Sequence, residues 1–262
     1  IFTSSYEHDD FGSLLFNYID VLEEIIPELH LSRDFQQHSP YHIYTMQDHI
    51  LKSVVELKKV TQKLPEFTAA IHAHWFELCI TMLLHDIAKP VCYTVDDGGT
   101  GHFYGHAEKS TELADGILAR LRFDTAGRTR ITQLIRYHDL PVAPEPKPIR
   151  RLMNKLGVEA VRQLFALHIA DTCGQSAICA GRVETYRQAE QVLDALLETD
   201  ACFSLRDLAV NGGDMLALGL RGRAVGAALQ ACLDAVMEEA VANDKTALLT
   251  YAAENLQRFA NS

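Results

Sequence analysis

The sequence predicts an all-α protein, a helical bundle followed by a C-terminal helical appendage. Apolar residues recur at intervals of three and four along most of the 262-residue chain, as in Phe11, Leu14, Leu15 and Tyr18. The run VCYTV at 91–95 is the only candidate strand. With 48% hydrophobic residues, a chain of this length can bury a sizeable core without disulfide bonds.

The predicted helices follow one another with short breaks. A first amphipathic helix covers 11–25 and is broken near Pro27, and further helices begin near residues 44, 68, 106, 125 and 158. A long helix with a polar face follows at 176–198. The Gly-rich segment 96–101 reads as a turn, and the proline-dense segment 141–148 as a surface loop. A boundary near Asp200 would separate a main domain, 1–200, from the appendage, 201–262.

A histidine and an aspartate stand side by side at the end of the apolar helix that begins near residue 68. The stripe through Leu78, Met82 and Leu83 continues onto His85 and Asp86. Burying a carboxylate without a partner costs several kcal/mol, so Asp86 needs a cationic side chain, backbone donors or a metal ion. The adjacent imidazole favours a metal.

A residue of a metal-ligand type also lies on the apolar face of four other helices. One metal-ligand type lies on the apolar stripe of each, namely His49, His106, His138 and Asp171. Any one such histidine is more often a hydrogen-bonded core residue, but five coincidences favour a shared metal site. Imidazole and carboxylate ligands suit one or two ions of iron, manganese, nickel or zinc, and magnesium is a further candidate.

These residues resemble the H…HD…D pattern of the HD-domain metal-dependent phosphohydrolases. A closer resemblance, from about Ile25 to Ala252, is to the HD half of bacterial CCA-adding tRNA nucleotidyltransferases. It is carried by SPYHIYTMQDHI, LLHDIAKP, HFYGHAEKS, IRYHDLP, ALHIADTCGQ, LRDLAVNGGDMLALGL and NDKTALLTYA. No Gly-rich loop with paired carboxylates, the head of a nucleotidyltransferase, precedes Tyr41, so we expect no nucleotide addition.

The resemblance implies metal-assisted hydrolysis of phosphoesters: nucleotides, 2′,3′-cyclic phosphates or RNA ends. Asp86 would be a catalytic residue and the ligand between two ions, and His106 and His138 would be the additional ligands of two-metal members. Lys89 matches the HDxxK pattern and would offset the charge of the substrate phosphate, although it could instead cap the helix end before Pro90. His102 competes with His106, whereas His42, His72, His74 and His168 have no counterpart in the pattern and are expected at the surface or behind the ligands.

The net charge of the chain limits the kind of molecule that it is expected to bind. A formal net charge of −11 disfavours a long polyanion and favours a small phosphorylated substrate such as a nucleotide, or an RNA 3′ end. Two basic groups flank His138, one at 120–136 and one at 147–155; most of their members are expected to be ordinary surface residues, with one or two reaching a phosphate. The six cysteines lack CxxC spacing and are expected to be small buried hydrophobes in a reducing, cytoplasmic setting.

Two other functions remain open from the sequence. Some HD proteins use the same ligands in mixed-valent di-iron oxygenases, and iron-specific oxygen consumption would identify one. The other is that of a non-catalytic RNA- or protein-binding remnant of a tRNA nucleotidyltransferase. No run of residues reaches the roughly 18 apolar positions of a membrane span, so no membrane partner is expected.

Overall fold

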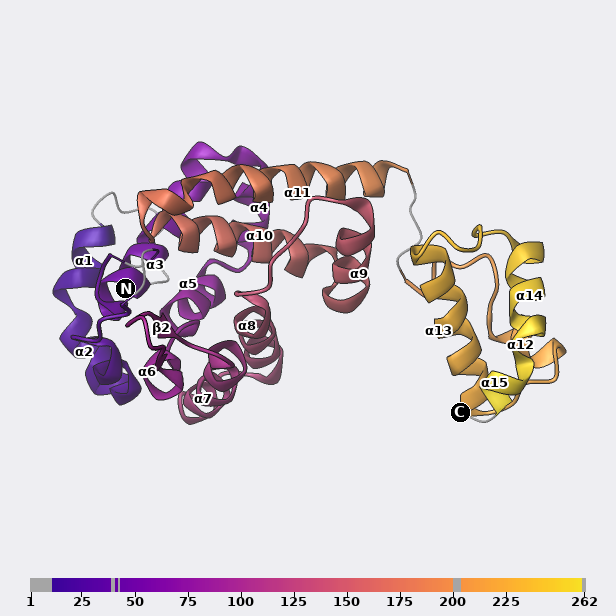
Figure 1. Ribbon diagram of the computed structural model, residues 1–262, viewed down its shortest axis with the longest axis horizontal. Coiled ribbons are helices and arrows are strands. Elements are labelled where there is room, and N and C mark those ends of the chain that lie inside the picture. The colour runs from indigo at the N-terminus through magenta and orange to yellow at the C-terminus, as the bar shows by residue number, and fades with distance from the viewer. Residues whose placement is uncertain (1–10, 39–40, 42, 200–203, 261–262) are drawn as a thin grey trace. The chain divides into compact units, whose positions relative to one another are not determined.

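A computed structural model describes residues 11–38, 41, 43–199 and 204–260. The chain is nearly all-helical, which confirms the predicted fold class (Figure 1). It divides into two compact units, one made of Ile1–Val142 and Val158–Gln188 and the other of Ala143–Gly157 and Ala189–Ser262. The predicted boundary near Asp200 falls among residues 200–203, which lie outside the described residues, and it stays a prediction.

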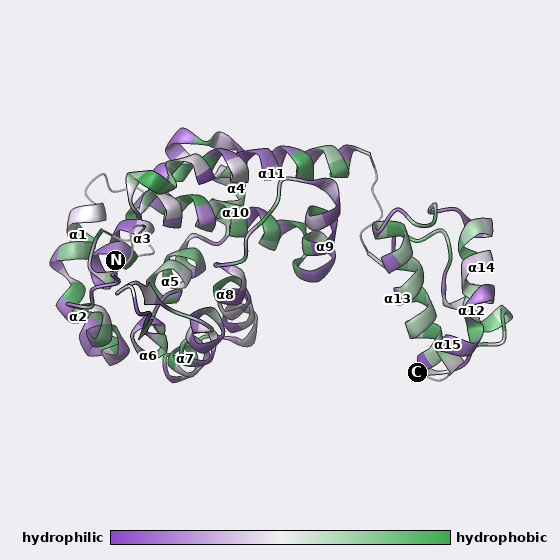
Figure 2. Cartoon of the chain, in the orientation of Figure 1, coloured by the Kyte–Doolittle hydropathy of each residue, from purple (hydrophilic) through white to green (hydrophobic). Residues whose placement is uncertain are grey.

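The first unit holds most of the helices. They are α1 (Phe11–Asn17), α2 (Ile19–Ile25), η2 (Pro27–Ser32), α3 (Met46–Lys63), η3 (Pro65–Phe67), α4 (Thr68–Ala73), α5 (Trp75–Leu84), α6 (Lys89–Cys92), α7 (His106–Arg120), α8 (Thr125–Tyr137), α10 (Val158–Cys173), η4 (Ala177–Ala180) and the start of α11 (Gly181–Glu198). Each of them carries both apolar and polar residues, as amphipathic helices do (Figure 2).

The core of this unit lies between α3, α5, α7, α8 and α10. Helix α10 packs against α3, α7 packs against α8, and α5 contacts both α3 and α8. Val54 and Leu57 of α3 and Leu164 of α10 are completely buried there. Two of these helices begin at side-chain caps, because Thr45 accepts from the Asp48 amide and Asp124 from the Gly127 amide. The packing brings the buried faces of all five helices toward one region.

Two predicted helices are broken in the structure. The first helix divides at Tyr18, and the helix expected from residue 68 divides at His74, because both residues leave helical backbone angles. Lys89 opens the short helix α6 instead of closing α5, since Pro90 is tolerated in a first turn but not in a helix interior. The proline-dense segment ends in helix α9 (Pro146–Leu156), which begins with Pro146 for the same reason.

A small antiparallel hairpin interrupts the helices. Strand β1 (Thr94–Val95) falls within the expected candidate, and β2 (Gly101–His102) pairs with it across the predicted turn. The glycine at 101 is required by close packing, because a Cβ atom there would lie 2.5 Å from the Gln37 carbonyl oxygen. A three-residue loop, 103–105, joins the hairpin to α7.

The second unit has its own core. Its helices are α9, α12 (Gly212–Ala217), α13 (Arg223–Met237), α14 (Lys245–Glu254), α15 (Leu256–Ala260) and the end of α11. Met215, Cys232 and Leu248 are completely buried among them. Asn211 and Asp214 form a reciprocal capping box at the start of α12.

No single helix among the described residues is both long and apolar enough to cross a membrane, and a pair that passes together, Pro65–Ala73 with Trp75–Cys92, is bent by 92°.

Candidate metal centre

Five helices of the first unit direct the predicted ligands to one place. His49 lies in the first turn of α3, His106 opens α7, and Asp171 lies in the last turn of α10. His85 directly follows α5 and His138 directly follows α8, each as the C-cap residue. The structure therefore brings all six predicted ligands together at helix ends, with Asp86 next to His85.

The four imidazoles are oriented by backbone carbonyls. The Nδ1 atoms of His85, His106 and His138 lie 2.7, 2.8 and 2.6 Å from the carbonyl oxygen three residues earlier in each case. His49 Nδ1 lies 3.1 Å from the carbonyl of Gly174. Because a carbonyl only accepts, each Nδ1 carries the proton and donates it. Each Nε2 is then left with a lone pair, the arrangement that metal-ligating histidines adopt.

A first group of ligand atoms surrounds a point between α3, α5 and α10. His49 Nε2 lies 3.0 Å from Asp171 Oδ1 and 3.3 Å from Asp86 Oδ2. His85 Nε2 lies 3.2 Å from Asp86 Oδ2 and 3.3 Å from Asp171 Oδ1. Two imidazoles and two carboxylates therefore face one another.

A second group shares Asp86 through its other oxygen. His138 Nε2 lies 3.3 Å and His106 Nε2 3.4 Å from Asp86 Oδ1, and the two Nε2 atoms are 3.2 Å apart. The carboxylate of Asp139, which follows His138, approaches His106 Nε2 at 4.0 Å. Asp86 thus lies between the two groups, as predicted for a bridging ligand.

Burial and charge act against each other in this centre. Burial works to raise the pKa of Asp86 and of Asp171, but the surrounding imidazoles, together with Lys89 at Asp86, hold both pKa values well below the usual range. Burial works to lower the pKa of His85, and the two carboxylates raise it to about 10. The centre thus keeps its carboxylates ionised and needs positive charge between them and the imidazoles.

The donor set fits a metal ion. Neither His85 Nε2 nor Asp171 Oδ1 makes a well-directed hydrogen bond among the described residues, although both are buried. With Nδ1 protonated, imidazole lone pairs face carboxylate oxygens at 3.0–3.4 Å, which is repulsive unless a cation or protons lie between them. His49, His85 and Asp171 form one group able to hold an ion, and His85, Asp86 and His138 another.

Lys89 lies inside the centre. Its Nζ is 2.6 Å from Asp86 Oδ2 and 3.1 Å from the Gln37 side-chain oxygen, and it faces the Phe103 ring at 5.4 Å. The side chain is almost completely buried, so a role as an exposed cap at a helix C-terminus does not describe it. Its role toward substrate stays a prediction.

The described histidines outside the ligand set lie where the sequence predicts them, at the surface or behind the ligands. His102 is on β2 and binds Asp96, not the ligand groups. His72 is exposed and His74 pairs with Glu159 at 2.9 Å, as expected for surface groups. His168 is buried behind Asp171, where desolvation lowers its pKa to about 3. His42 lies outside the described residues.

The cysteine prediction holds for three positions and fails for one. Cys79, Cys179 and Cys232 are buried, Cys92 is half-buried, and all five described cysteines are free thiols. Cys173 is exposed, because the last turn of α10 carries it away from the core. Cys202 lies outside the described residues.

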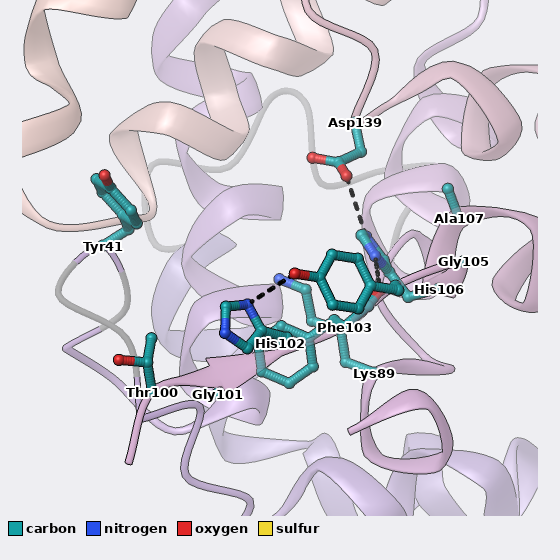
Figure 3. A pocket seen from close by; sticks show the side chains of 11 residues that line it. Tyr41, Lys89, Thr100, Gly101, His102, Phe103, Gly105, His106, Ala107 and Asp139 are labelled. Atoms are coloured by element: carbon teal, nitrogen blue, oxygen red, sulfur yellow. Dashed lines mark hydrogen bonds and ion pairs between the residues drawn. The ribbon is translucent and has the colours of Figure 1, made fainter. Parts of the chain in front are cut away.

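Two cavities open beside the centre. One, of about 600 Å³, is lined by His106, Asp139 and Lys89 and by aromatic residues around the hairpin (Figure 3). The other, of about 290 Å³, is lined by His138, Asp139, His168, Asp171 and residues of α10, α11 and the loops. Predicted ligands therefore line both cavities, His106 the larger one and His138 and Asp171 the smaller one, and Asp139 lines both.

Four functional candidates were missed by sequence reasoning. Asp139 repeats the His-Asp doublet of 85–86, a signal that was available. Gln175 donates to Asp171 Oδ2 at 2.8 Å, and Arg182 and Tyr186 line the smaller cavity. Gln175 stands at the end of the quoted stretch ALHIADTCGQ, a signal that was available, whereas Arg182 and Tyr186 are ordinary polar residues of a helix and carry none.

Most of the basic residues that flank His138 in sequence are paired with acidic side chains. Arg120 binds Glu28 at 2.7 Å, and Arg128 binds Asp115 at 2.7 Å. In the second unit, Arg150 binds Glu239 and Arg151 binds Glu238. This supports the interpretation of most of them as surface residues.

Comparison with known proteins identifies relatives of two kinds. Residues 149–252 match a family model described as tRNA nucleotidyltransferase domain 2. The chain is 28% identical over 239 residues to a CC-adding tRNA nucleotidyltransferase of Thermus thermophilus, covering 90% of this chain and 51% of that protein. It is 26% identical over 180 residues to bifunctional uridylyltransferase/uridylyl-removing enzymes of Bordetella parapertussis and Bordetella bronchiseptica, covering 63% of this chain and 19% of each. The resemblance to tRNA nucleotidyltransferases is confirmed. The matched part of the chain spans about half the length of the Thermus protein and about a fifth of the length of the Bordetella proteins.

Proposed function

We propose that this chain, a distant relative of the tRNA nucleotidyltransferases with an HD-like helical domain, is a metal-dependent phosphoric ester hydrolase. One observation carries the proposal: four imidazoles with Nδ1 directed to carbonyls surround the two oxygens of Asp86. Facing the carboxylates, these imidazoles need either a second proton or a bound cation, and Nε2 atoms gathered from four helices around one carboxylate are the arrangement that holds a cation.

The residues of the centre have separate tasks. Bound metal would lower the pKa of a water molecule and offset charge on the phosphoryl oxygens. The ligands His49, His85 and Asp171 would hold one ion, and His106 and His138 would hold a second, with Asp86 between them. Lys89, held 2.6 Å from Asp86, adds a fixed positive charge beside the place where phosphoryl charge grows. No side chain is needed as a nucleophile.

Small nucleotides, 2′,3′-cyclic phosphates or RNA ends are the proposed substrates. A cavity of about 600 Å³ is within the usual range for small-molecule sites. The net charge of −11 opposes extended contact with a long polyanion. A single phosphate at the centre would avoid this repulsion.

The experiment is metal analysis of protein purified without chelator, followed by a panel of phosphoesters that includes nucleoside 2′,3′-cyclic and 3′-phosphates. We expect one or two equivalents of a transition metal and hydrolysis of at least one ester. Asp86→Ala should lose both metal and activity while keeping its helical content. Asp115→Ala is the matched control, because this exposed aspartate pairs with Arg128 at the surface.

Two results would contradict the proposal. A stable wild-type protein that takes up no metal would show that the six predicted ligands do not form a metal centre. A metal-loaded protein that hydrolyses no phosphoester would exclude the proposed hydrolase activity. Oxygen consumption with iron would then identify the oxygenase alternative.

A further inference from the structure

We infer that the larger cavity is a nucleoside-binding site and that the stacked pair His102–Tyr104 receives the aromatic base. The inference deepens the proposed phosphohydrolase function and rests on it for the position of the phosphate. It concerns residues of the β-hairpin and the loop after it, none of which belongs to the predicted metal ligands.

The cavity connects the hairpin to the metal centre. His106 and Asp139 lie at one side of it, and His102 and Tyr41 at the other (Figure 3). Its volume of about 600 Å³ exceeds what a lone phosphate occupies and suits a phosphate with an attached nucleoside. A phosphate at His106 would therefore place the rest of a nucleotide among the aromatic residues.

The pair His102–Tyr104 offers a flat aromatic surface. The two rings lie 5.3 Å apart and are inclined by only 7°. Tyr104 is 78% exposed, so its ring fills no core. An exposed ring held parallel to its neighbour leaves an outer face on which a base can stack.

The pair is fixed by hydrogen bonds. His102 Nε2 lies 2.9 Å from Asp96 Oδ2, and the Tyr104 hydroxyl lies 3.4 Å from His102 Nδ1. Asp96 is held in turn by the amides of Gly98 and Thr100, each at 2.9 Å. The rings therefore need little reorganisation when a ligand binds, which favours affinity.

The hairpin is also tied to the centre. The Gly101 amide donates to the His38 carbonyl at 3.0 Å, and the adjacent Gln37 accepts from Lys89 Nζ. This chain of contacts holds the aromatic pair and the metal centre in one arrangement. The spacing between base and phosphate is thus set by the fold.

The test compares two ligands that differ only in the base, adenosine 5′-monophosphate and ribose 5-phosphate. Each is titrated calorimetrically into the metal-loaded protein, and phosphate release is measured in the same samples. Wild type should bind the nucleotide at least about 10-fold more tightly, within the range that base stacking on an aromatic side chain provides. Tyr104→Ala should abolish that difference and leave the affinity for ribose 5-phosphate unchanged.

Two further variants make the result specific. Tyr104→Phe keeps the ring and loses only the long 3.4 Å contact of the hydroxyl with His102, so it should retain the preference for the nucleotide. Tyr18→Ala removes a half-exposed tyrosine that does not line the cavity, and it should change neither affinity. Circular dichroism spectra should be the same for all variants, since neither tyrosine is buried.

The outcomes separate this inference from the proposed function. Equal affinity of wild type for the two ligands, or a Tyr104→Ala variant that still prefers the nucleotide, overturns the base site whether or not phosphate is released. A preference that depends on Tyr104 without hydrolysis of any ester supports the base site and contradicts the hydrolase.

Discussion

The four ligand histidines share one feature at the residue scale: a backbone carbonyl receives the Nδ1 proton of each. Three of these carbonyls lie three residues earlier, on the last turn of the preceding helix or in the loop before it. The fourth, Gly174, is 125 residues away from His49. These contacts select the tautomer that leaves Nε2 free to coordinate a metal ion.

Lys89→Ala should keep its metal and lose activity. An ammonium cannot bind a cation but can offset charge on a phosphoryl group, so we expect a loss of about 2 to 4 kcal/mol of transition-state stabilisation in kcat/KM. The measurement is steady-state kinetics with metal content determined on the same sample. Lys109→Ala, which removes a half-exposed lysine paired with Glu112, is the control. Unchanged kcat/KM in fully metallated Lys89→Ala protein would limit Lys89 to a structural contact with Asp86.

Gln175→Ala should weaken metal binding without removing a ligand. The Gln175 amide donates to Asp171 Oδ2 at 2.8 Å and leaves Oδ1 directed at His49 and His85. Loss of such an orienting partner typically costs about 10- to 100-fold in metal affinity. Competition with a chromophoric chelator measures this, and Gln188→Ala on the exposed part of α11 should bind like wild type. An affinity equal to that of the control would rule out the orienting role.

At the scale of elements, the close approach of α10 to α3 is what assembles the centre. Gly174 follows α10 directly, and a Cβ atom there would lie 2.4 Å from Ser53 Oγ and 3.2 Å from the Ser53 amide nitrogen. Only glycine permits this contact, and the contact positions the Gly174 carbonyl for His49.

Gly174→Ala should therefore affect stability and metal affinity together. We expect a loss of about 1 to 3 kcal/mol in the free energy of unfolding, as for other overpacked sites, and weaker metal binding. Urea unfolding and metal titration are the measurements. Gly181→Ala is the control, since a Cβ atom at that position meets nothing within 4 Å. Ser53→Ala in the same chain should recover part of the loss; a Gly174→Ala protein with wild-type values would show that the helices can separate without cost.

Buried Glu23 joins α2, the end of η2 and α3, and it makes unfolding depend on pH. Burial works to raise its pKa, but hydrogen bonds from Arg33 and Gln47 outweigh burial and lower it. The charged form is thus favoured by folding, and its contribution is complete above the unfolded pKa, roughly 4.3. It is lost as the pH falls through the lower folded pKa.

Glu23→Gln should cost about 1 to 3 kcal/mol in unfolding free energy at pH 7, the range for hydrogen bonds to charged groups. Its stability should also fall less steeply than that of wild type below pH 4. Urea unfolding at a series of pH values tests both, with exposed Glu24→Gln as the control. Parallel pH curves for wild type and Glu23→Gln would contradict this assignment.

At the scale of the whole molecule, the two units differ in whether their stability is expected to depend on bound metal. All six predicted ligands lie in the first unit, whereas the second has a separate apolar core formed within residues 208–259. Metal should therefore stabilise only the first unit.

Chelation is predicted to reduce hydrogen-exchange protection in α3, α5, α7, α8 and α10 and to leave α12–α15 unchanged. A ligand present at 100 times its Kd stabilises by about 2.7 kcal/mol, so the exchange rates of globally protected amides should change by roughly 100-fold. Hydrogen-exchange mass spectrometry with and without chelator measures this. The Asp86→Ala protein should show no response, and an equal response in both units would contradict the assignment of all ligands to one.

The sequence by itself determined the fold class and which side chains face the core. A period near 3.6 places His49, Asp86 and Asp171 on buried faces, and burial of an ionised group demands a partner. That reasoning is local, so it works without knowledge of neighbouring helices. The role of Asp86 as the shared ligand came instead from the family resemblance, and in the structure this carboxylate lies between two groups of imidazoles.

Only the tertiary structure decided which atoms meet. The pairing of His49 with the Gly174 carbonyl and the cavity beside Tyr104 depend on contacts between segments far apart in the chain or between loops. Periodicity specifies a face and not the element opposite it. The breaks at Tyr18 and His74 escaped prediction for a related reason, since tertiary packing overrides local helix propensity at such residues.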